Sequence, residues 1–269
     1  AKRLVEGPGE AGEGGEAGDV TIHAWDLPFY TSYVKNHLLR VDSAAMAAYF
    51  PLDRCLDGLG LVAGRLFGIE LREAPLARGE SWAGAAGGSG ATRVAGAGGE
   101  LRKLELVHER EGVLGTIYLD LYPREGKHTH SAHFTLRCGK TLDRATGARQ
   151  LPSVALVCNF PKPTEDRPSL LTHDQAETFF HEFGHCLHTL LTETDTTRFA
   201  GTSVERDFVE APSQMLESWV WSPETLPLMS GHYETGEPLP ADLLDRMIAA
   251  KTLGAGMLDQ GQVWLGSID

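Results

Sequence analysis

The segment from residue 172 to residue 191 constrains the fold more than any other part of the sequence. Thr172 and Gln175 have the spacing of a capping box, which starts many helices. The apolar residues that follow recur every three or four positions, as on a helix face that packs on a core. They are Ala176, Phe179, Phe180, Phe183, Leu187, Leu190 and Leu191. The sequence therefore predicts one long amphipathic helix with a buried face.

Three polar residues on this helix form the pattern HExxH. His181 and His185 are about one turn apart, so both imidazoles can bind the same Zn²⁺ at about 2.0 to 2.1 Å. Glu182 points about 100° further round, where its carboxylate can reach a zinc-bound water without binding the metal. Chance register on an ordinary helix is the alternative for any short motif. The cap and the apolar face favour a zinc site with a glutamate base.

A zinc site needs a third protein ligand, and a hydrolytic site keeps its fourth position open for water. No HxxGxxH extension follows His185 in this sequence. The ligand must therefore come from another segment, and the acidic candidates between residues 199 and 219 are Glu205, Asp207, Glu210 and Glu217. Spacing alone does not choose among these four.

The remaining histidines near the motif have less specific interpretations. His188 could approach the metal, but we expect it to contact a ligand or solvent instead. We expect His128, His130 and His133 to be solvated turn residues, with substrate contact as the alternative. Cys186 is expected to be a small packing residue, because a fourth protein ligand would close the site.

Composition excludes several classes of protein. The chain is 42% hydrophobic and 23% charged, as in folded globular proteins. Its formal charge of −13 disfavours binding to nucleic acid or to an anionic membrane. No apolar run reaches the roughly 18 to 20 residues of a membrane-spanning helix. The cysteines form no CxxC pair, which favours a reducing compartment; they are Cys55, Cys138, Cys158 and Cys186.

Two glycine-rich segments divide the chain. Residues 1–19 contain six of the 31 glycines, and 13 of the 17 residues in 83–99 are Gly or Ala. Such segments bury little, so we expect a flexible lead-in at 1–19 and a surface-loop insertion at 83–99. A nucleotide-binding glycine loop is the alternative, but neither the GxGxxG nor the GxxxxGK[ST] pattern is present in its setting.

The remaining sequence predicts helices around a small sheet. Apolar spacing predicts two helices between residues 24 and 71, separated at Pro51. Residues 116–122 and 133–136 are β-rich and read as a hairpin, and residues 154–158 could join the same sheet. Most of the chain after Pro168 reads helical. The predicted fold class is α+β, mainly α with a small β-sheet.

A resemblance adds to these observations. His181 to His185, with Gly201-Thr202 and the DFVEAPS sequence at Asp207–Ser213, closely resembles the thimet oligopeptidase family of zinc peptidases, which includes mitochondrial intermediate peptidase. Weaker matches begin near Ala24. They include Tyr49–Leu52, Leu66–Ile69, Trp82, Tyr118–Lys127 and Asn159–Ser169. The stretches Asp120–Lys127 and Val204–Trp221 are more thimet-oligopeptidase-like, and the shorter matches at Leu104–Ile117 and Leu151-Pro152 are more intermediate-peptidase-like, so the longer matches favour the former.

The resemblance implies a zincin-type catalytic region in which Glu210 is the third ligand. It implies one Zn²⁺ held by His181, His185 and Glu210, with Glu182 as the general base. The implied activity is metalloendopeptidase cleavage of oligopeptides, with amino-terminal presequences of imported precursors as the second choice. The implied location is the cytoplasm, with the mitochondrial matrix as the alternative. The oligomeric state stays open.

The chain departs from the family pattern after the third ligand. The family carries a Gly/Tyr-rich loop that helps to bind substrate, and we find no counterpart in this sequence. We therefore expect residues 20–269 to be a partial peptidase domain. A zinc-binding but catalytically incomplete fragment is the alternative function, and a purely structural or interaction domain is a second one. We also expect residues 116–122 to bind a peptide by edge pairing.

Overall fold

The computed structural model describes residues 23–82 and 101–268. The predicted lead-in at 1–19 and the insertion at 83–99 lie outside these residues. The described chain forms two compact units, residues 43–244 and residues 23–42 with 245–268. Each unit is described by itself below.

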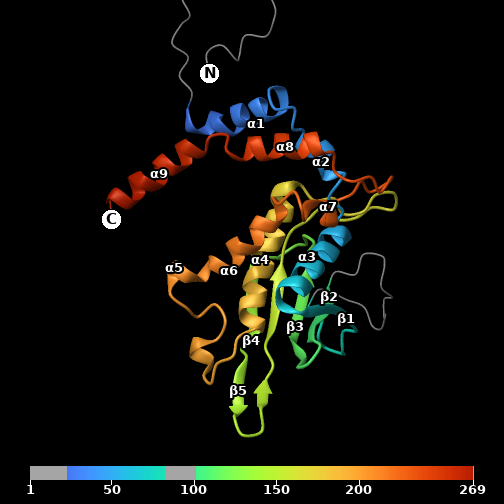
Figure 1. Ribbon diagram of the computed structural model, residues 1–269, viewed down its shortest axis with the longest axis vertical. Helices are drawn as coiled ribbons and strands as arrows, with labels where there is room; N and C mark the ends of the chain where they lie inside the picture. Colours follow the sequence, from blue (N-terminus) through green and yellow to red (C-terminus); the bar gives the residue numbers. More distant parts are fainter. Residues whose placement is uncertain (1–22, 83–100, 269) are drawn as a thin grey trace, which may run out of the picture. The chain divides into compact units, whose positions relative to one another are not determined.

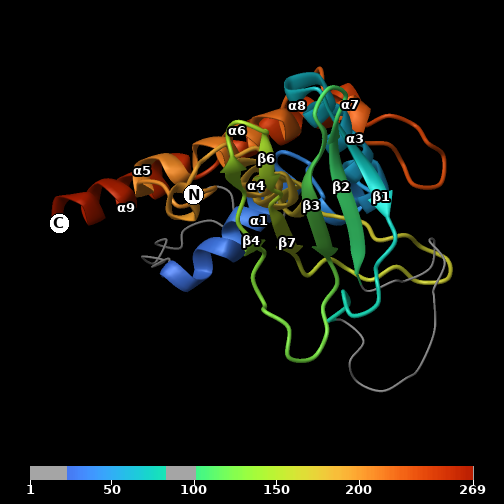
Figure 2. The ribbon, with the colours of Figure 1, turned by 90° about the horizontal axis from the view of Figure 1, so that it is seen from below.

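The larger unit is built on a five-stranded mixed sheet in the order β1-β2-β3-β7-β4 (Figures 1 and 2). β1 pairs antiparallel with β2 and β2 with β3, whereas β3 and β7 are parallel and β7 pairs antiparallel with β4. The strands are β1 Ile69–Ala74, β2 Arg102–His108, β3 Gly112–Asp120, β4 Ala132–Arg137 and β7 Ser153–Val157. A separate hairpin joins β5 Lys140–Asp143 to β6 Ala148–Gln150.

The predicted hairpin between residues 116–122 and 133–136 is wrong, although both segments are strands. β7 lies between β3 and β4 and pairs with both of them. Residues 154–157 of β7 are buried, which suits an interior strand, and the 121–131 connection is long for a tight turn. The predicted third strand is therefore confirmed, and it lies between the two strands that a hairpin would have paired.

This strand order also determines which strand has unpaired main-chain groups that could bind a peptide. β3, which contains most of residues 116–122, is bonded on both sides, so the expectation that it binds a peptide by edge pairing is wrong. β4 pairs only with β7 among the described strands, so one side of its backbone is an open edge. β1 and β4 are therefore the two edge strands of the described sheet, and β4 contacts α4.

The helices of the larger unit follow the predicted pattern, and the chain is α+β as expected. The bounds are α2 Ser43–Ala47, α3 Leu52–Phe67, α4 His173–Leu190, α5 Arg206–Val209, α6 Ala211–Glu217 and α7 Leu226–Met229, with 3₁₀ turns η2 Thr197–Phe199 and η3 Ser218–Val220. α4 contacts β7, β4 and β3 on one side and α6 on another. The long helix from Thr172 is confirmed as α4.

The start and the buried face of α4 match the sequence pattern. The Thr172 hydroxyl accepts the Gln175 N–H at 3.2 Å, and the Gln175 side chain accepts the Thr172 N–H at 3.0 Å. The apolar residues of the pattern are buried, except for the half-buried Leu191. The rings of Phe179 and Phe160 meet edge to face at 5.7 Å, which fixes the helix against the segment after β7.

The smaller unit contains η1 Ala24–Asp26, α1 Leu27–His37, α9 Ala255–Ile268 and most of α8 Ala241–Lys251. α1 and α3 confirm the two helices predicted between residues 24 and 71, and α2 is an additional short one. Among the described residues, the helices are all too short or too polar to cross a membrane.

Candidate metal centre

Two side chains of α4 meet a third that comes from a later segment of the chain. His181 Nε2 lies 3.2 Å from His185 Nε2 and 3.3 Å from Glu210 Oε2, and His185 Nε2 lies 3.1 Å from Glu210 Oε2. We call these residues the His-His-Glu cluster. Ligand atoms about 2.0 to 2.1 Å from a tetrahedral zinc are themselves about 3.3 to 3.4 Å apart. The cluster therefore has the donor types and the spacing that suit one zinc ion.

The local structure explains how Glu210 reaches the two histidines. Glu210 lies between α5 and α6, and α6 packs directly on α4. The buried Ser213 hydroxyl lies 2.8 Å from Glu210 Oε2 and 2.9 Å from the Glu210 carbonyl oxygen. This serine, which the sequence did not single out, holds the carboxylate in its orientation.

Glu217 has a different place from Glu210. Its Oε1 lies 2.5 Å from His181 Nδ1, on the far side of the ring from the cluster. A proton on Nδ1 leaves the Nε2 lone pair for a metal, and such carboxylate partners orient most metal-binding histidines. The other two candidates, Glu205 and Asp207, are exposed and outside the cluster.

Glu182 lies outside the cluster and next to it. Its side chain is partly buried, and burial is the main cause that raises its pKa. The neighbouring His181 and a hydrogen bond from the His133 main-chain N–H lower that pKa in part, and the charge of Glu210 raises it. The His133 N–H thus ties Glu182 to strand β4.

His133 is not a solvated turn residue, so that prediction is wrong. It lies on β4, and its Nε2 is 3.0 Å from the Thr189 hydroxyl on α4. Its ring centroid lies 6.1 Å from that of His185. Burial, with the nearby charges of His185 and His188, lowers the pKa of His133 to about 4, so the ring is neutral near pH 7. His128 and His130 are exposed, as predicted.

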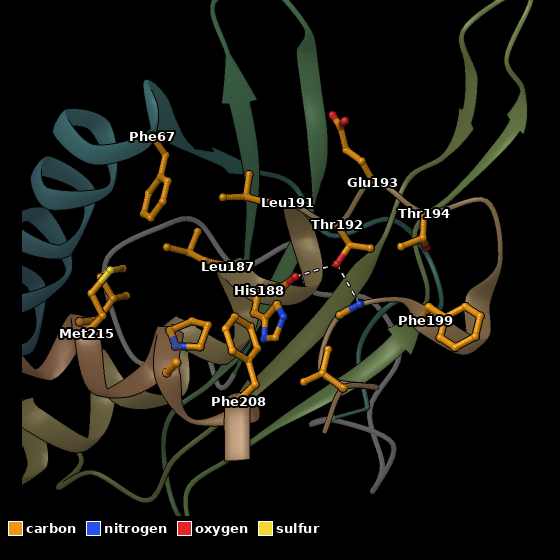
Figure 3. A pocket seen from close by; sticks show the side chains of 16 residues that line it. Phe67, Leu187, His188, Leu191, Thr192, Glu193, Thr194, Phe199, Phe208 and Met215 are labelled. Carbon is orange, nitrogen blue, oxygen red and sulfur yellow. Dashed lines mark hydrogen bonds between the residues drawn. The ribbon is translucent and has the colours of Figure 1, made fainter. Parts of the chain in front are cut away.

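A largely apolar pocket of about 570 Å³ is shown in Figure 3, and its lining includes Gly184 and Ala211, the sequence neighbours of His185 and Glu210. It is lined by the C-terminal half of α4, the following segment to Val204, α5, α6, and Phe67 at the end of α3. His188 lines this cavity and meets the Phe208 ring at 6.1 Å, and burial lowers its pKa. No member of the His-His-Glu cluster is among the described residues that line it. His188 is outside the His-His-Glu cluster, and its described ring contact is with Phe208 and not with a cluster residue. Cys186 is buried in the core, as predicted.

α4 and α6 approach each other closely at Gly184. A Cβ atom on Gly184 would lie 2.5 Å from Ser213 Cα and 2.9 Å from the Pro212 carbonyl oxygen. Backbone atoms cannot yield as a flexible side chain can. The absence of a side chain at Gly184 is therefore what lets Glu210 approach the two histidines.

We expect Gly184→Ala to weaken metal binding by about tenfold or more, because overpacking strain of about 1 to 3 kcal/mol pushes α6 and Glu210 away from α4. The measurement is zinc affinity by competition with a chromogenic chelator, alongside a thermal melt. Gly261→Ala is the control, because a Cβ at Gly261 on α9 meets nothing within 4 Å. Unchanged zinc affinity in Gly184→Ala would show that the helix contact does not position Glu210.

Comparison with known proteins identifies related sequences. A family model described as Peptidase family M3 matches residues 10–269. The chain is 39% identical over 248 residues to the mitochondrial intermediate peptidase of Arabidopsis thaliana, which covers 92% of the chain and 33% of the relative. It is 38% identical over 255 residues to oligopeptidase A of Salmonella typhimurium, covering 94% of the chain and 35% of the relative.

A third relative gives the same result. The chain is 37% identical over 264 residues to the thimet-like oligopeptidase of Dictyostelium discoideum, covering 97% of the chain and 36% of the relative. The chain thus spans about a third of the length of the curated relatives it matches.

Proposed function

The chain belongs to peptidase family M3, and we propose that it forms the zinc-binding region of a metalloendopeptidase that hydrolyses oligopeptides. The observation that carries this proposal is the His-His-Glu cluster, whose 3.1 to 3.3 Å spacing suits a tetrahedral zinc. The helix with HExxH beside a strand edge supports a zincin-type arrangement. Presequence peptides are the second substrate class, since one relative is named mitochondrial intermediate peptidase.

His181, His185 and Glu210 would hold the ion, and Glu217 and Ser213 would hold two of these side chains in place. Zinc supplies Lewis acidity, which lowers the pKa of water to about 7 and polarises a carbonyl group. Glu182 accepts the proton of the attacking water and passes it to the leaving nitrogen. The His133 N–H keeps the Glu182 carboxylate at the edge of β4.

The substrate would lie along β4. Along an antiparallel strand, the main-chain N–H and C=O groups of successive residues point alternately toward the neighbouring strand and away from it. The N–H of His133 points toward Glu182, so the main-chain groups of His133 are on the side of β4 that faces away from β7. The backbone of Thr135, two residues on, faces the same way. An extended peptide can add to this edge through main-chain hydrogen bonds, which brings its carbonyl groups next to Glu182.

The test is zinc content combined with hydrolysis. We expect about one zinc per chain by elemental analysis, and cleavage of a quenched fluorescent oligopeptide that stops with a chelator and returns with added zinc. Zinc binding without cleavage would select the catalytically incomplete alternative. Absence of stoichiometric zinc would exclude the metallopeptidase proposal.

A further inference from the structure

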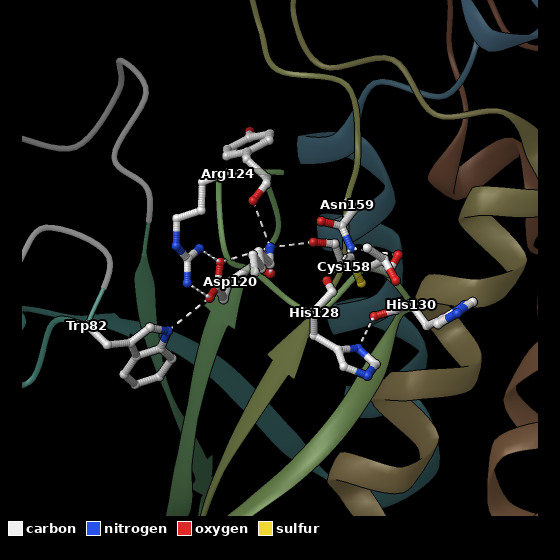
Figure 4. Close-up of polar contacts among 10 residues, drawn as sticks. Trp82, Asp120, Arg124, His128, His130, Cys158 and Asn159 are labelled. Carbon is white, nitrogen blue, oxygen red and sulfur yellow. Dashed lines mark hydrogen bonds and ion pairs between the residues drawn. The ribbon is translucent and has the colours of Figure 1, made fainter.

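A buried ion cluster lies at the C-terminal ends of β3 and β7 (Figure 4). The side chains of Asp120 and Lys127 are 2% and 3% exposed, and Lys127 Nζ lies 2.9 Å from Asp120 Oδ1. Arg124 donates to both Asp120 carboxylate oxygens at 2.6 and 2.7 Å, and Trp82 Nε1 donates to Oδ2 at 2.9 Å. Buried charges cost stability unless they are paired and hydrogen-bonded, and these are both.

The Lys127 ammonium also binds three main-chain carbonyl groups. It donates to the carbonyl oxygens of Asp120 at 2.9 Å and of Tyr122 at 2.7 Å, and to that of Cys158. Asp120 ends β3, Tyr122 lies in the loop after it, and Cys158 directly follows β7. The Lys127 side chain therefore links the ends of the parallel strands β3 and β7 to the loop that follows β3.

The same loop is held a second time, near its far end. Asn159 Nδ2 donates to the carbonyl oxygens of His128 at 2.9 Å and of Thr129 at 3.0 Å. Residues 121–131 contain neither helix nor strand, and they run directly into Ala132, the first residue of β4. Side-chain hydrogen bonds from Lys127 and Asn159 thus set where β4 begins.

The start of β4 in turn sets the place of His133, whose Nε2 lies 3.0 Å from the Thr189 hydroxyl on α4 and whose ring centroid lies 6.1 Å from that of the cluster residue His185. We propose that Asp120, Lys127 and Asn159 are positioning residues, which align the open edge of β4 with the His-His-Glu cluster for peptide binding. This inference rests on the proposed function, because it takes that edge as the site of the peptide. The alternative is that the ion cluster of Asp120 and Lys127 only stabilises the sheet.

The ion pair of Lys103 and Glu80 provides a control that distinguishes positioning of β4 from stabilisation of the sheet. Lys103 on β2 has a side chain 15% exposed, and its Nζ lies 2.9 Å from the Glu80 carboxylate. None of the contacts described for Lys103 reaches residues 121–131. Lys103→Met therefore removes a similar partly buried cation without releasing the loop.

The experiment measures inhibitor affinity against inhibitor length in the zinc-loaded protein. Acetohydroxamate reports on the metal alone, and peptide hydroxamates of increasing length add main-chain groups that can pair with β4. We expect longer inhibitors to bind the unmodified protein more tightly. In Lys127→Met and in Asn159→Ala, the increase in affinity from the shortest to the longest inhibitor should be smaller by about tenfold or more, because two or more main-chain hydrogen bonds are misaligned. Their zinc content and acetohydroxamate affinity should stay unchanged.

Lys103→Met should keep the full gain in affinity with length. The inference is overturned if Asn159→Ala keeps the gain as well, or if Lys103→Met loses it equally. Should Lys127→Met fail to fold, Asn159→Ala still decides, because it releases the loop without disturbing a buried charge. A protein that binds neither zinc nor acetohydroxamate would refute the proposed function, and the inference with it.

Discussion

Glu182→Gln is expected to abolish peptide hydrolysis while zinc stays bound. The amide cannot accept a proton from water, and the loss of a general base costs at least about 10² to 10⁴-fold in rate. The substitution keeps the shape of the side chain, and the carbonyl oxygen of the new amide would still accept the His133 N–H. The measurement is kcat/KM on a quenched oligopeptide, together with zinc content by elemental analysis.

Glu193→Gln is the control for this change of charge. Glu193 is an exposed residue in the segment after α4, and its Oε1 lies 3.4 Å from Arg149 Nη1. An exposed ion pair of this kind contributes little, so the rate should change by less than about threefold. Retained hydrolysis in Glu182→Gln would remove Glu182 from the mechanism, whereas loss of zinc would mean that it binds the metal.

Glu210→Ala is expected to reduce zinc affinity by more than about 100-fold, and Glu217→Ala by about 10 to 100-fold. The first change removes a member of the His-His-Glu cluster. The second removes only the carboxylate that lies 2.5 Å from His181 Nδ1. Glu217→Gln should recover part of the second loss, because its carbonyl oxygen can still accept the Nδ1 proton. Competition with a chelator of known zinc affinity measures all three variants.

The order of these two effects tests the assignment of the third ligand. If Glu217→Ala weakens zinc more than Glu210→Ala, the carboxylates have been assigned to the wrong roles. Equal and small effects would mean that neither contributes a ligand. Circular dichroism on each variant shows whether the helices α4 and α6 remain intact.

The helix that carries the motif could be predicted from sequence because its determinants are local. The capping box of Thr172 and Gln175 and the spacing of the apolar residues are properties of neighbouring positions. The pairing of β4 is not local. Nothing in residues 116–136 shows that β7, some twenty residues later, inserts between the two strands, and long-range pairing of this kind is decided by packing of the whole sheet.

The site was predictable in part for the same reason. HExxH sets two side chains by helical geometry, but four acidic residues satisfied the spacing for a third ligand. Resemblance selected Glu210, and the structure brings Glu210 to the two histidines. The role of Glu217 was missed, although a signal existed: a metal-binding histidine usually needs a carboxylate partner for its other nitrogen, so one of the remaining acidic residues was required.

The open edge of β4 bears on how substrates would be selected. Only a chain with unpaired main-chain amide and carbonyl groups can add itself to a strand, and in a native protein nearly all such groups already have partners. Selection by β4 would therefore depend on the conformation of the polypeptide more than on its side chains. Unfolded segments and short degradation products fulfil this condition whatever their sequence, whereas intact folded proteins are protected by their own hydrogen bonds.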